Sequence, residues 1–352
     1  MADASDIPGE VLKSLRAGAV IPAHPLALTP SRALDERRQR ALSRYYVDAG
    51  AGGLAVGVHT TQFAIREAGL YEPVLRLAAE TAADWASRPM IMIAGLCGGT
   101  DQARREAGVA RSLGYHAGLL SLAALGQADE DELIRHSEAI AAEIPVVGFY
   151  LQRAVGGRDL SAAFWRRFAA IENVVAIKMA PFDRYRTIDV IRGVVEARAE
   201  DRVALYTGND DHILLDLVTP FRMVRDGEEV EMRIRGGLLG HWSAWTKRAV
   251  EMHARARAAA EAGAIPADLL ALDSQVTDAN GALFDVRNDF AGCIAGCHEV
   301  LRRQGLLENM ALLDPEEGLG PGQAAEIDRV SAAYPHLADD AFVKENLDRW
   351  LS

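Results

Sequence analysis

Short apolar runs alternate with longer amphipathic stretches along most of the chain. Most of these runs have the length of a β-strand and lack a regular polar alternation, so both faces of each strand are expected to be buried. The intervening stretches place apolar residues at helical spacing, for example over 34–50, 101–114 and 129–143. The predicted strands are 19–28, 52–58, 90–96, 116–122, 145–151, 174–180, 203–209 and 235–242.

This rhythm of strands and helices predicts an α/β fold. Eight βα units with a spacing of one unit throughout indicate a closed (β/α)8 TIM barrel over 19–262, preceded by an N-terminal segment, 1–18. A doubly wound open sheet is the alternative. It is disfavoured because no Gly-x-Gly-x-x-Gly turn follows the first predicted strand.

Two features depart from a plain barrel. The stretch 221–235 alternates apolar and polar residues around Asp226-Gly227, which predicts a β-hairpin inserted beside the barrel. The remaining region, 263–352, is predicted to be a C-terminal helical extension that caps one barrel end or serves an oligomer interface. Its helical patterns cover 281–304, 323–333 and 339–350.

Charge and composition narrow the class of protein. Fifty acidic against 38 basic residues leave a formal charge of −12, which argues against nucleic acid or an anionic membrane as the main partner. The N-terminus lacks the pattern of a signal peptide, and no run approaches 18 uninterrupted apolar residues. The low, odd cysteine count of three fits a cytoplasmic protein. Cys293, Cys297 and His298 raise the possibility of a metal site, but their helical segment favours buried thiols.

Lys178 is the sharpest chemical signal in the chain. Active groups of a (β/α)8 barrel project from the C-terminal ends of its strands, and Lys178 lies near that end of strand 174–180. Alternation places it on the face of Val174 and Ala176, and if that face is the interior, burial lowers the lysine pKa. A neutral amine is a nucleophile that forms Schiff bases. The alternative is a lysine that points outward or pairs with Asp183.

Tyr150 favours the reactive interpretation. It ends the preceding strand, on the face of Val146 and Gly148, so the two side chains are expected at the same barrel end. A phenol beside an iminium can relay protons. The alternative is a tyrosine that fills the top layer of the barrel.

At this point the sequence resembles the dihydrodipicolinate synthase / N-acetylneuraminate lyase family of class I aldolases, as a divergent member. The resemblance rests on "GFY" and "VVAIKMA" one βα unit apart, in the places of the family's strand-five tyrosine and strand-six Schiff-base lysine. In addition, "AGAGGLAVGVHTTQF" is similar to the family's "GvdGlvvgGTTGE", "YTGNDD" to its "G-x-D", and "RGGLLG" to its "Ga-x-G". The motif order is specific and spans nearly the whole chain.

The resemblance implies a lyase, synthase or dehydratase. In such an enzyme Lys178 forms an imine with a 2-oxo acid such as pyruvate or with a sugar-derived acid, and Tyr150 is the proton relay. Thr60 and Thr61 would hold the substrate carboxylate, with His59 as an extra donor or base or else a structural histidine. The arginine of the strand-five motif has moved to Arg153, and the "G-x-D" motif contributes Gly208 and Asp210. The resemblance implies no cofactor and no metal, and a homo-oligomer, either a dimer or a tetramer.

Several motifs depart from the family pattern. His59 marks either an inserted residue before the threonine pair or a replacement of that pair by Val58 and His59. The "PPYY" tyrosine after strand four is missing, and "DSSGD" after the lysine is replaced by "MAPFD". These changes argue against dihydrodipicolinate synthase itself.

Two other functions remain open. One is a barrel that binds an oxo acid without turning it over, because the missing tyrosine leaves the proton relay incomplete. The other is a metal-dependent lyase, because carboxylate and imidazole groups suit divalent ions. Its candidate ligands are Asp210, Asp211, His212 and His241.

Overall fold

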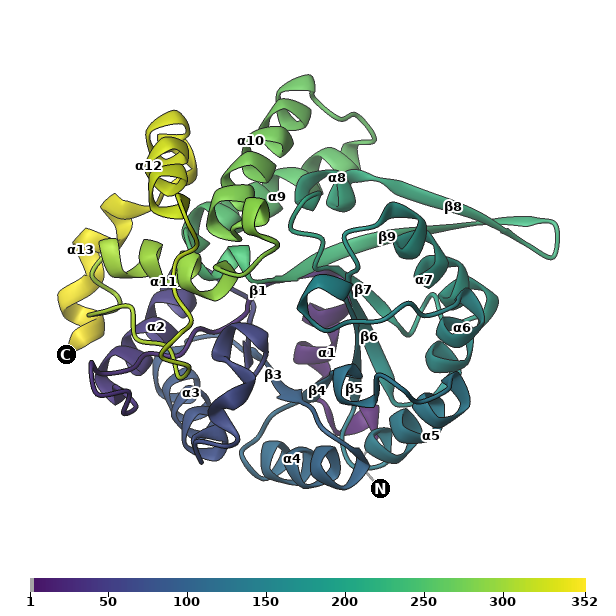
Figure 1. Cartoon of the computed structure of the whole chain (residues 1–352). Coiled ribbons are helices and arrows are strands. Elements are labelled where there is room, and N and C mark those ends of the chain that lie inside the picture. The colour runs from purple at the N-terminus through teal and green to yellow at the C-terminus, as the bar shows by residue number, and fades with distance from the viewer. Residues whose placement is uncertain (1–2) are drawn as a thin grey trace.

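The protein is described by a computed structural model that covers residues 3–352. Eight parallel strands form a (β/α)8 barrel, as predicted, with helices around it (Figure 1). Neighbouring strands follow the order β1-β9-β7-β6-β5-β4-β3-β2, and a parallel bridge between Ala23 and Ala55 closes β1 against β2. The strands are β1 (Val20–Pro22), β2 (Gly53–Val56), β3 (Ile91–Leu96), β4 (Ala117–Leu120), β5 (Val146–Leu151), β6 (Val174–Ala180), β7 (Ala204–Thr207) and β9 (Glu228–Leu239).

Outer helices cover the barrel and are delimited by capping residues. Asp35, Asp129, Ser161 and Asp183 each accept a backbone N–H in the first turn of the helix that follows them, which satisfies a donor that the helix leaves unpaired. The helices are α2 (Glu36–Ala49), α3 (Tyr71–Trp85), α4 (Thr100–Ser112), α5 (Glu130–Ala141), α6 (Ala162–Ala170), α7 (Arg184–Glu196), α8 (Ile213–Val218) and α9 (Thr246–Ala262).

The segment before the barrel forms helix α1 (Gly9–Ala17), which closes the N-terminal end of the barrel. Its residues Val11 and Leu15 are buried in one cluster with Ile91 and Ala204, the first residues of β3 and β7. In Figure 1 this helix lies behind the centre of the barrel. The barrel interior is therefore open only at the opposite end, where the strands terminate.

A hairpin projects from the side of the barrel (Figure 1). Strand β8 (Pro220–Arg225) pairs antiparallel with the first half of β9, and the turn between them is Asp226-Gly227, both at positive φ. The second strand of the hairpin and the eighth barrel strand are not separate elements, as the sequence analysis expected. They are one strand, β9, whose second half pairs with β1 and β7.

The C-terminal region is helical and lies against one side of the barrel, with its first helices near the open end (Figure 1). The expected helix over 281–304 is two helices, because the chain breaks at Phe284–Gly292, where Asp285, Asp289 and Phe290 adopt positive φ. Within residues 3–352, no helix is long and apolar enough to cross a bilayer. The helices are α10 (Ala267–Leu283), α11 (Cys293–Arg303), α12 (Gln323–Ala333) and α13 (Asp340–Leu351).

One irregularity in the barrel decides the geometry of the site. Val146 pairs with Val174, but the next residue of β5, Val147, pairs with Ala176, so β6 contains one extra residue at this point. Beyond it, Phe149 faces Lys178 and Tyr150 faces Met179. Because side chains alternate along a strand, a regular pairing would place Tyr150 and Lys178 on the same face of the sheet. The shift places them on opposite faces and puts Phe149 on the face of Lys178.

Candidate functional site

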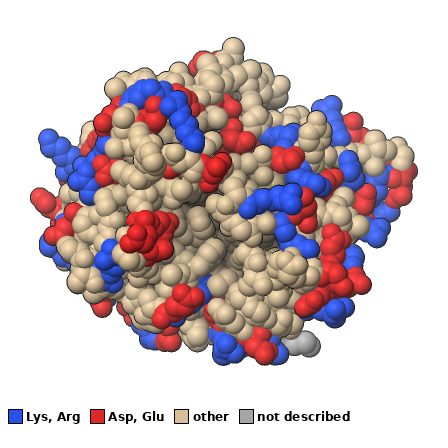
Figure 2. Space-filling view, in the orientation of Figure 1, with Lys and Arg blue, Asp and Glu red and all other residues tan. Residues whose placement is uncertain are grey.

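A pocket opens at the C-terminal end of the barrel strands, in the hollow at the centre of the face shown in Figure 2. The surface around the hollow is mostly uncharged, with acidic and basic side chains further out. The pocket and the open solvent at its mouth together span about 590 Å³. Its lining consists of Ala23, Val58, His59, Thr60, Phe149, Leu151, Gln152, Val155, Lys178, Ala180, Phe182, Gly208, Asp210, Gly240, Phe284, Cys293, Ile294 and Cys297.

Lys178 lies in this pocket with a side chain that is 8% exposed. It faces the interior with Ala176 and Ala180, whereas Val174 belongs to the core outside the barrel because of the extra residue in β6. Burial lowers the pKa of Lys178 to about 8, against the opposing effect of Asp210. The amine is therefore partly neutral near physiological pH and available as a nucleophile.

Gly208 gives the lysine its path into the pocket. A Cβ atom at this position would lie 2.6 Å from Cε of Lys178 and 2.8 Å from Cβ of Ala180. Any larger residue at position 208 would thus collide with the lysine side chain or force it to move.

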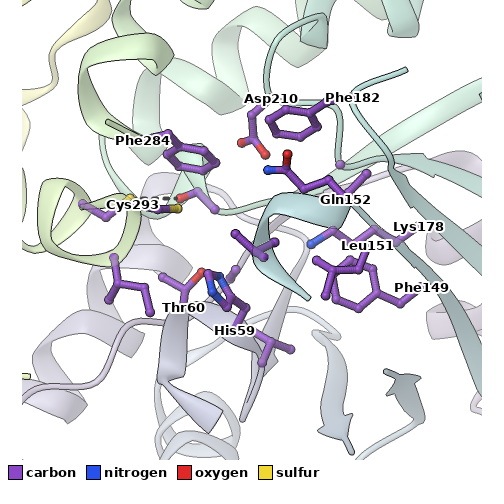
Figure 3. A pocket seen from close by; sticks show the side chains of 18 residues that line it. His59, Thr60, Phe149, Leu151, Gln152, Lys178, Phe182, Asp210, Phe284 and Cys293 are labelled. Carbon is purple, nitrogen blue, oxygen red and sulfur yellow. Dashed lines mark hydrogen bonds between the residues drawn. The ribbon is translucent and has the colours of Figure 1, made fainter. Parts of the chain in front are cut away.

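Asp210 follows β7 and faces the same pocket (Figure 3). Its Oδ1 accepts a hydrogen bond from the backbone N–H of His241 at 3.0 Å. Burial raises the pKa of Asp210 to about 7, although the Lys178 ammonium opposes this change. The expected alternative, an ion pair of Lys178 with Asp183, is not formed, because Asp183 caps α7 by accepting from the N–H groups of Tyr185 and Arg186.

The expected juxtaposition of Tyr150 and Lys178 is wrong. Tyr150 lies outside the barrel, where its ring packs on Trp165 at a centroid distance of 5.2 Å and its hydroxyl accepts from Leu160 N–H at 3.2 Å. The residue that faces Lys178 is Phe149, with the lysine Nζ 4.4 Å from the ring centroid. The cause is the extra residue in β6, which shifts the pairing by one.

The loop after β2 contributes His59 and Thr60 to the pocket but not Thr61. Thr61 is buried beneath the loop, where its hydroxyl donates to His24 O at 2.6 Å and accepts from Gly57 N–H at 3.0 Å. Burial and the nearby Lys178 ammonium lower the pKa of His59 to about 4, so its imidazole is neutral at physiological pH.

Arg153 does not reach the pocket, contrary to expectation. Its side chain is 77% exposed and pairs with Asp159 at 3.2 Å on the outer surface. The polar residue of this segment that does line the pocket is its neighbour Gln152 (Figure 3). Strand β5 ends at Leu151, and Arg153 begins a 3-10 helical turn, Arg153–Val155, for which Gln152 is the N-cap.

The C-terminal region supplies one wall of the pocket, which the sequence analysis did not foresee. Phe284, Cys293, Ile294 and Cys297 line it from the α10–α11 segment (Figure 3). Burial raises the pKa of the Cys297 thiol to about 12 and that of Cys293 above its ordinary value. Both thiols are therefore protonated, as expected of buried cysteines. The local sequence pattern indicates only that α11 is amphipathic, and this gives no sign that it faces a pocket.

The candidate ligands of the metal-dependent alternative are not gathered around one point. Asp210 accepts from the backbone of His241, and the ring Nδ1 of His241 lies 3.4 Å from Nδ2 of Asn280. Across residues 3–352, no group of three or more His, Cys, Asp or Glu residues is arranged to hold a metal ion. The geometry of the described residues therefore does not support that alternative.

Comparison with known proteins places this geometry in context. Residues 17–219 match the model of the dihydrodipicolinate synthetase family. No curated protein matches the sequence significantly.

Solved structures of similar fold include a chloride-inhibited dihydrodipicolinate synthase from Acinetobacter baumannii complexed with pyruvate. It has a TM-score of 0.73 and 19% identity, with 90% of this chain and 98% of that chain covered. YagE, a prophage protein of the same family from E. coli K12 in complex with pyruvate, has a TM-score of 0.71 and 18% identity, with 91% and 98% covered.

Dihydrodipicolinate synthase from Bacteroides thetaiotaomicron has a TM-score of 0.73 and 14% identity, with 91% and 99% covered. At these identities the structural likeness establishes the fold, and the match to the family model over more than half of the chain establishes the family. The chain thus belongs to the dihydrodipicolinate synthetase family.

Proposed function

We propose that the protein is a class I, Schiff-base-forming lyase or synthase in which Lys178 forms an imine with a 2-oxo acid. The observation that carries this proposal is the buried amine of Lys178, whose pKa is lowered to about 8, at the C-terminal end of a barrel strand. Imine formation turns the former carbonyl carbon into an electron sink, so that an adjacent bond can form or break. Cleavage, condensation and dehydration all use this step.

The polar side of the pocket suits the acid group of such a substrate. Thr60 is 6% exposed and lines the pocket beside His59, so its hydroxyl is available as a donor to a carboxylate. Gln152 supplies a further amide donor from the opposite side of the mouth. Lys178 would then attack the carbonyl carbon next to the bound carboxylate.

The remaining walls favour a substrate with an apolar far end over a polyhydroxylated sugar acid. Among the described lining residues none is an arginine, and Arg153 points away from the pocket. Apolar residues, among them Phe149, Phe182 and Phe284, form most of the wall, and burying sugar hydroxyls against them would leave hydrogen bonds unmade. For the same reason a second substrate with two ionised groups would fit poorly.

The alternative of a barrel that binds an oxo acid without turnover also predicts an imine at Lys178. The two functions differ in product formation, because only the enzyme converts the bound acid. We also propose that the protein forms a homo-oligomer, a dimer or a tetramer, which light scattering of the purified protein would test.

Borohydride trapping tests the proposed imine directly. The protein is incubated with pyruvate, 2-oxobutyrate, phenylpyruvate or a sugar-derived 2-oxo acid, reduced with borohydride and weighed by mass spectrometry. The chain has four lysines, Lys13, Lys178, Lys247 and Lys344, so peptide mapping locates the adduct unambiguously. We expect one adduct at Lys178, absent in Lys178→Ala and retained in Lys13→Met, a matched exposed-lysine control.

Absence of an adduct with every oxo acid, or an adduct that persists in Lys178→Ala, would overturn the proposal. A stronger adduct with the sugar-derived acid than with phenylpyruvate would contradict the proposed preference for an apolar end.

A further inference from the structure

Imine formation at Lys178 requires a proton donor and acceptor, and the aromatic ring that faces the lysine provides neither. Phe149 occupies that place, and the only exchangeable proton of Tyr150 lies outside the barrel beside Leu160. A carbinolamine cannot lose its hydroxyl as water at a useful rate unless a nearby group protonates that hydroxyl. The pocket must therefore supply this group from elsewhere.

The titratable side chains of the pocket, apart from Lys178, are His59, Asp210, Cys293 and Cys297. The two thiols are poor acids and exchange protons slowly near neutral pH, because burial raises their pKa. His59, on the loop after β2, is neutral, because burial and the nearby Lys178 ammonium lower its pKa to about 4, so it is a weak base and carries no readily donated proton near neutral pH. Asp210 follows β7, the strand paired with β6, and lines the same pocket as Lys178, whose ammonium acts on its carboxylate (Figure 3).

We propose that Asp210 is the general acid and base of the imine chemistry, donating to and accepting from the atoms of the substrate bound at Lys178. This role rests on the proposed function. It goes beyond substrate binding, because the Asp210 carboxyl transfers the protons that the Tyr150 hydroxyl cannot transfer from outside the barrel.

In the proposed steps Asp210 is the single group that donates protons to the substrate and accepts them. The neutral amine of Lys178 attacks the carbonyl carbon, and its electron pair forms the C–N bond while the carbonyl oxygen takes the proton of the Asp210 carboxyl. The carboxylate next removes a proton from the nitrogen and returns it to the hydroxyl, which leaves as water. The products are a protonated imine and the Asp210 carboxylate, one positive and one negative charge from two neutral groups.

The carboxylate then removes a proton from the carbon next to the imine. The C–H electron pair moves to form the carbon–carbon double bond of a neutral enamine, and Asp210 is again a neutral acid. The enamine is the nucleophile needed for bond formation. Cleavage yields the same enamine, which then takes a proton back from Asp210 in the reverse of this step.

The electrostatics of the pocket support this cycle. The pKa of Lys178 is lowered to about 8 and that of Asp210 is raised to about 7, so a neutral amine and a neutral acid are both accessible near physiological pH. The groups that surround Asp210 are the Lys178 ammonium, the Asp211 carboxylate and the two thiols, together with the His241 N–H that orients one carboxylate oxygen.

Exchange of substrate hydrogen with solvent separates this role from imine formation itself. Wild type, Asp210→Asn, Asp210→Glu and His59→Asn are incubated with pyruvate in D₂O, and loss of the methyl proton signal is followed by NMR from pH 5 to 10. Borohydride adducts are measured on the same samples. Asparagine retains an acceptor for the His241 N–H but cannot act as a general acid or base near neutral pH.

We expect wild type to exchange, and Asp210→Asn to form the adduct after long incubation yet exchange at least about 100-fold more slowly, the usual scale of general acid–base catalysis. His59→Asn should exchange substantially faster than Asp210→Asn, because it leaves the Asp210 carboxyl in place. Asp210→Glu should restore part of the rate with a shifted pH profile.

Exchange by Asp210→Asn at the wild-type rate, or loss of exchange in His59→Asn alone, would overturn the role of Asp210. If wild type forms the adduct but does not exchange hydrogen, the role of Asp210 is overturned while the imine stands. If wild type forms no adduct at all, both the proposed function and the role of Asp210 are overturned. If Asp210→Asn does not fold by circular dichroism, Asp210→Glu decides, because an unchanged pH profile in that variant would contradict the proposal.

Discussion

Phe149 and Lys178 stand opposite each other across the β5–β6 pair, with the ammonium nitrogen 4.4 Å from the ring centroid. A ring at this distance contacts a cation favourably but cannot exchange a proton with it. Tyr150, one residue further, is on the other face of β5. The nature of the residue beside the Lys178 amine thus depends on a shift of a single residue in β6.

Tyr150→Phe is expected to leave the borohydride adduct at Lys178 unchanged, since the hydroxyl lies outside the barrel. It should lower the free energy of unfolding by about 1 to 3 kcal/mol, because Leu160 N–H loses its buried acceptor. Urea unfolding and adduct yield would be measured together, with Tyr185→Phe as the control, because Tyr185 is exposed and should show no effect on either. Loss of the adduct in Tyr150→Phe would return the tyrosine to the site.

Gly208→Ala is expected to slow imine formation at least about tenfold, since the added methyl group would lie 2.6 Å from Cε of Lys178. The overpacking should cost about 1 to 3 kcal/mol of stability. The matched control is Gly108→Ala in α4, where nothing lies within 4 Å of the added atom and stability should rise by up to about 1 kcal/mol. Equal adduct formation rates in both variants would show that Lys178 does not need this space.

Lys178→Met/Asp210→Asn is expected to be more stable than wild type by about 1 to 4 kcal/mol near pH 7.5, because it removes two buried charges. From pH 3.8 to about 7 the folded protein holds the Asp210 proton more tightly than the unfolded chain, so wild-type stability falls as pH rises. From about 8 to 10.5 the unfolded chain holds the Lys178 proton more tightly, so stability rises with pH.

The folded wild type therefore carries the free-energy cost of both buried charges, the Lys178 ammonium and the Asp210 carboxylate, only between about pH 7 and 8. The stability advantage of the double variant should be largest in this range. Urea unfolding at pH 5, 7.5 and 10 measures this difference, with Lys13→Met as a control that should show none. A double variant less stable than wild type at pH 7.5 would mean that the pair stabilises the fold.

Arg66→Met is expected to destabilise the protein by about 3 to 5 kcal/mol, because it leaves the Glu106 carboxylate buried without its partner. The pair is bidentate at 2.9 Å with side chains only 10% and 8% exposed, and Arg66 also binds the carbonyl groups of Gly57 and Gly95 behind the pocket.

Arg76→Met is the control, because the Arg76–Glu72 pair is about half exposed on both sides and should contribute at most about 1 kcal/mol. Thermal and urea unfolding of the two variants would be compared. Equal losses of stability in the two variants would show that burial of the Arg66–Glu106 pair does not increase its contribution to stability.

The sequence by itself determined the elements that local pattern encodes. Apolar runs and amphipathic stretches specified the eight barrel strands and their order, and the position of Lys178 near the end of its strand placed the amine at the open end of the barrel. Gly208, Asp210, His59 and Thr60 reach the pocket as expected, because they directly follow strands that all end on one side.

Only the tertiary structure decided which face of β5 looks inward. In "PVVGFY" both faces are apolar and buried, so the pattern does not distinguish Phe149 from Tyr150, and the extra residue in β6 leaves no mark in "VVAIKMA". The same holds for Thr61 and Arg153, whose hydrogen bond and ion pair turn them away from the pocket.

The wall formed by Phe284, Cys293 and Cys297 comes from residues more than 70 positions beyond Asp210. Contacts over such a separation depend on how complete helices pack, and no local periodicity records that packing. Local chemistry could therefore be read from the chain, whereas the aromatic residue beside Lys178 and the C-terminal wall of the pocket could not.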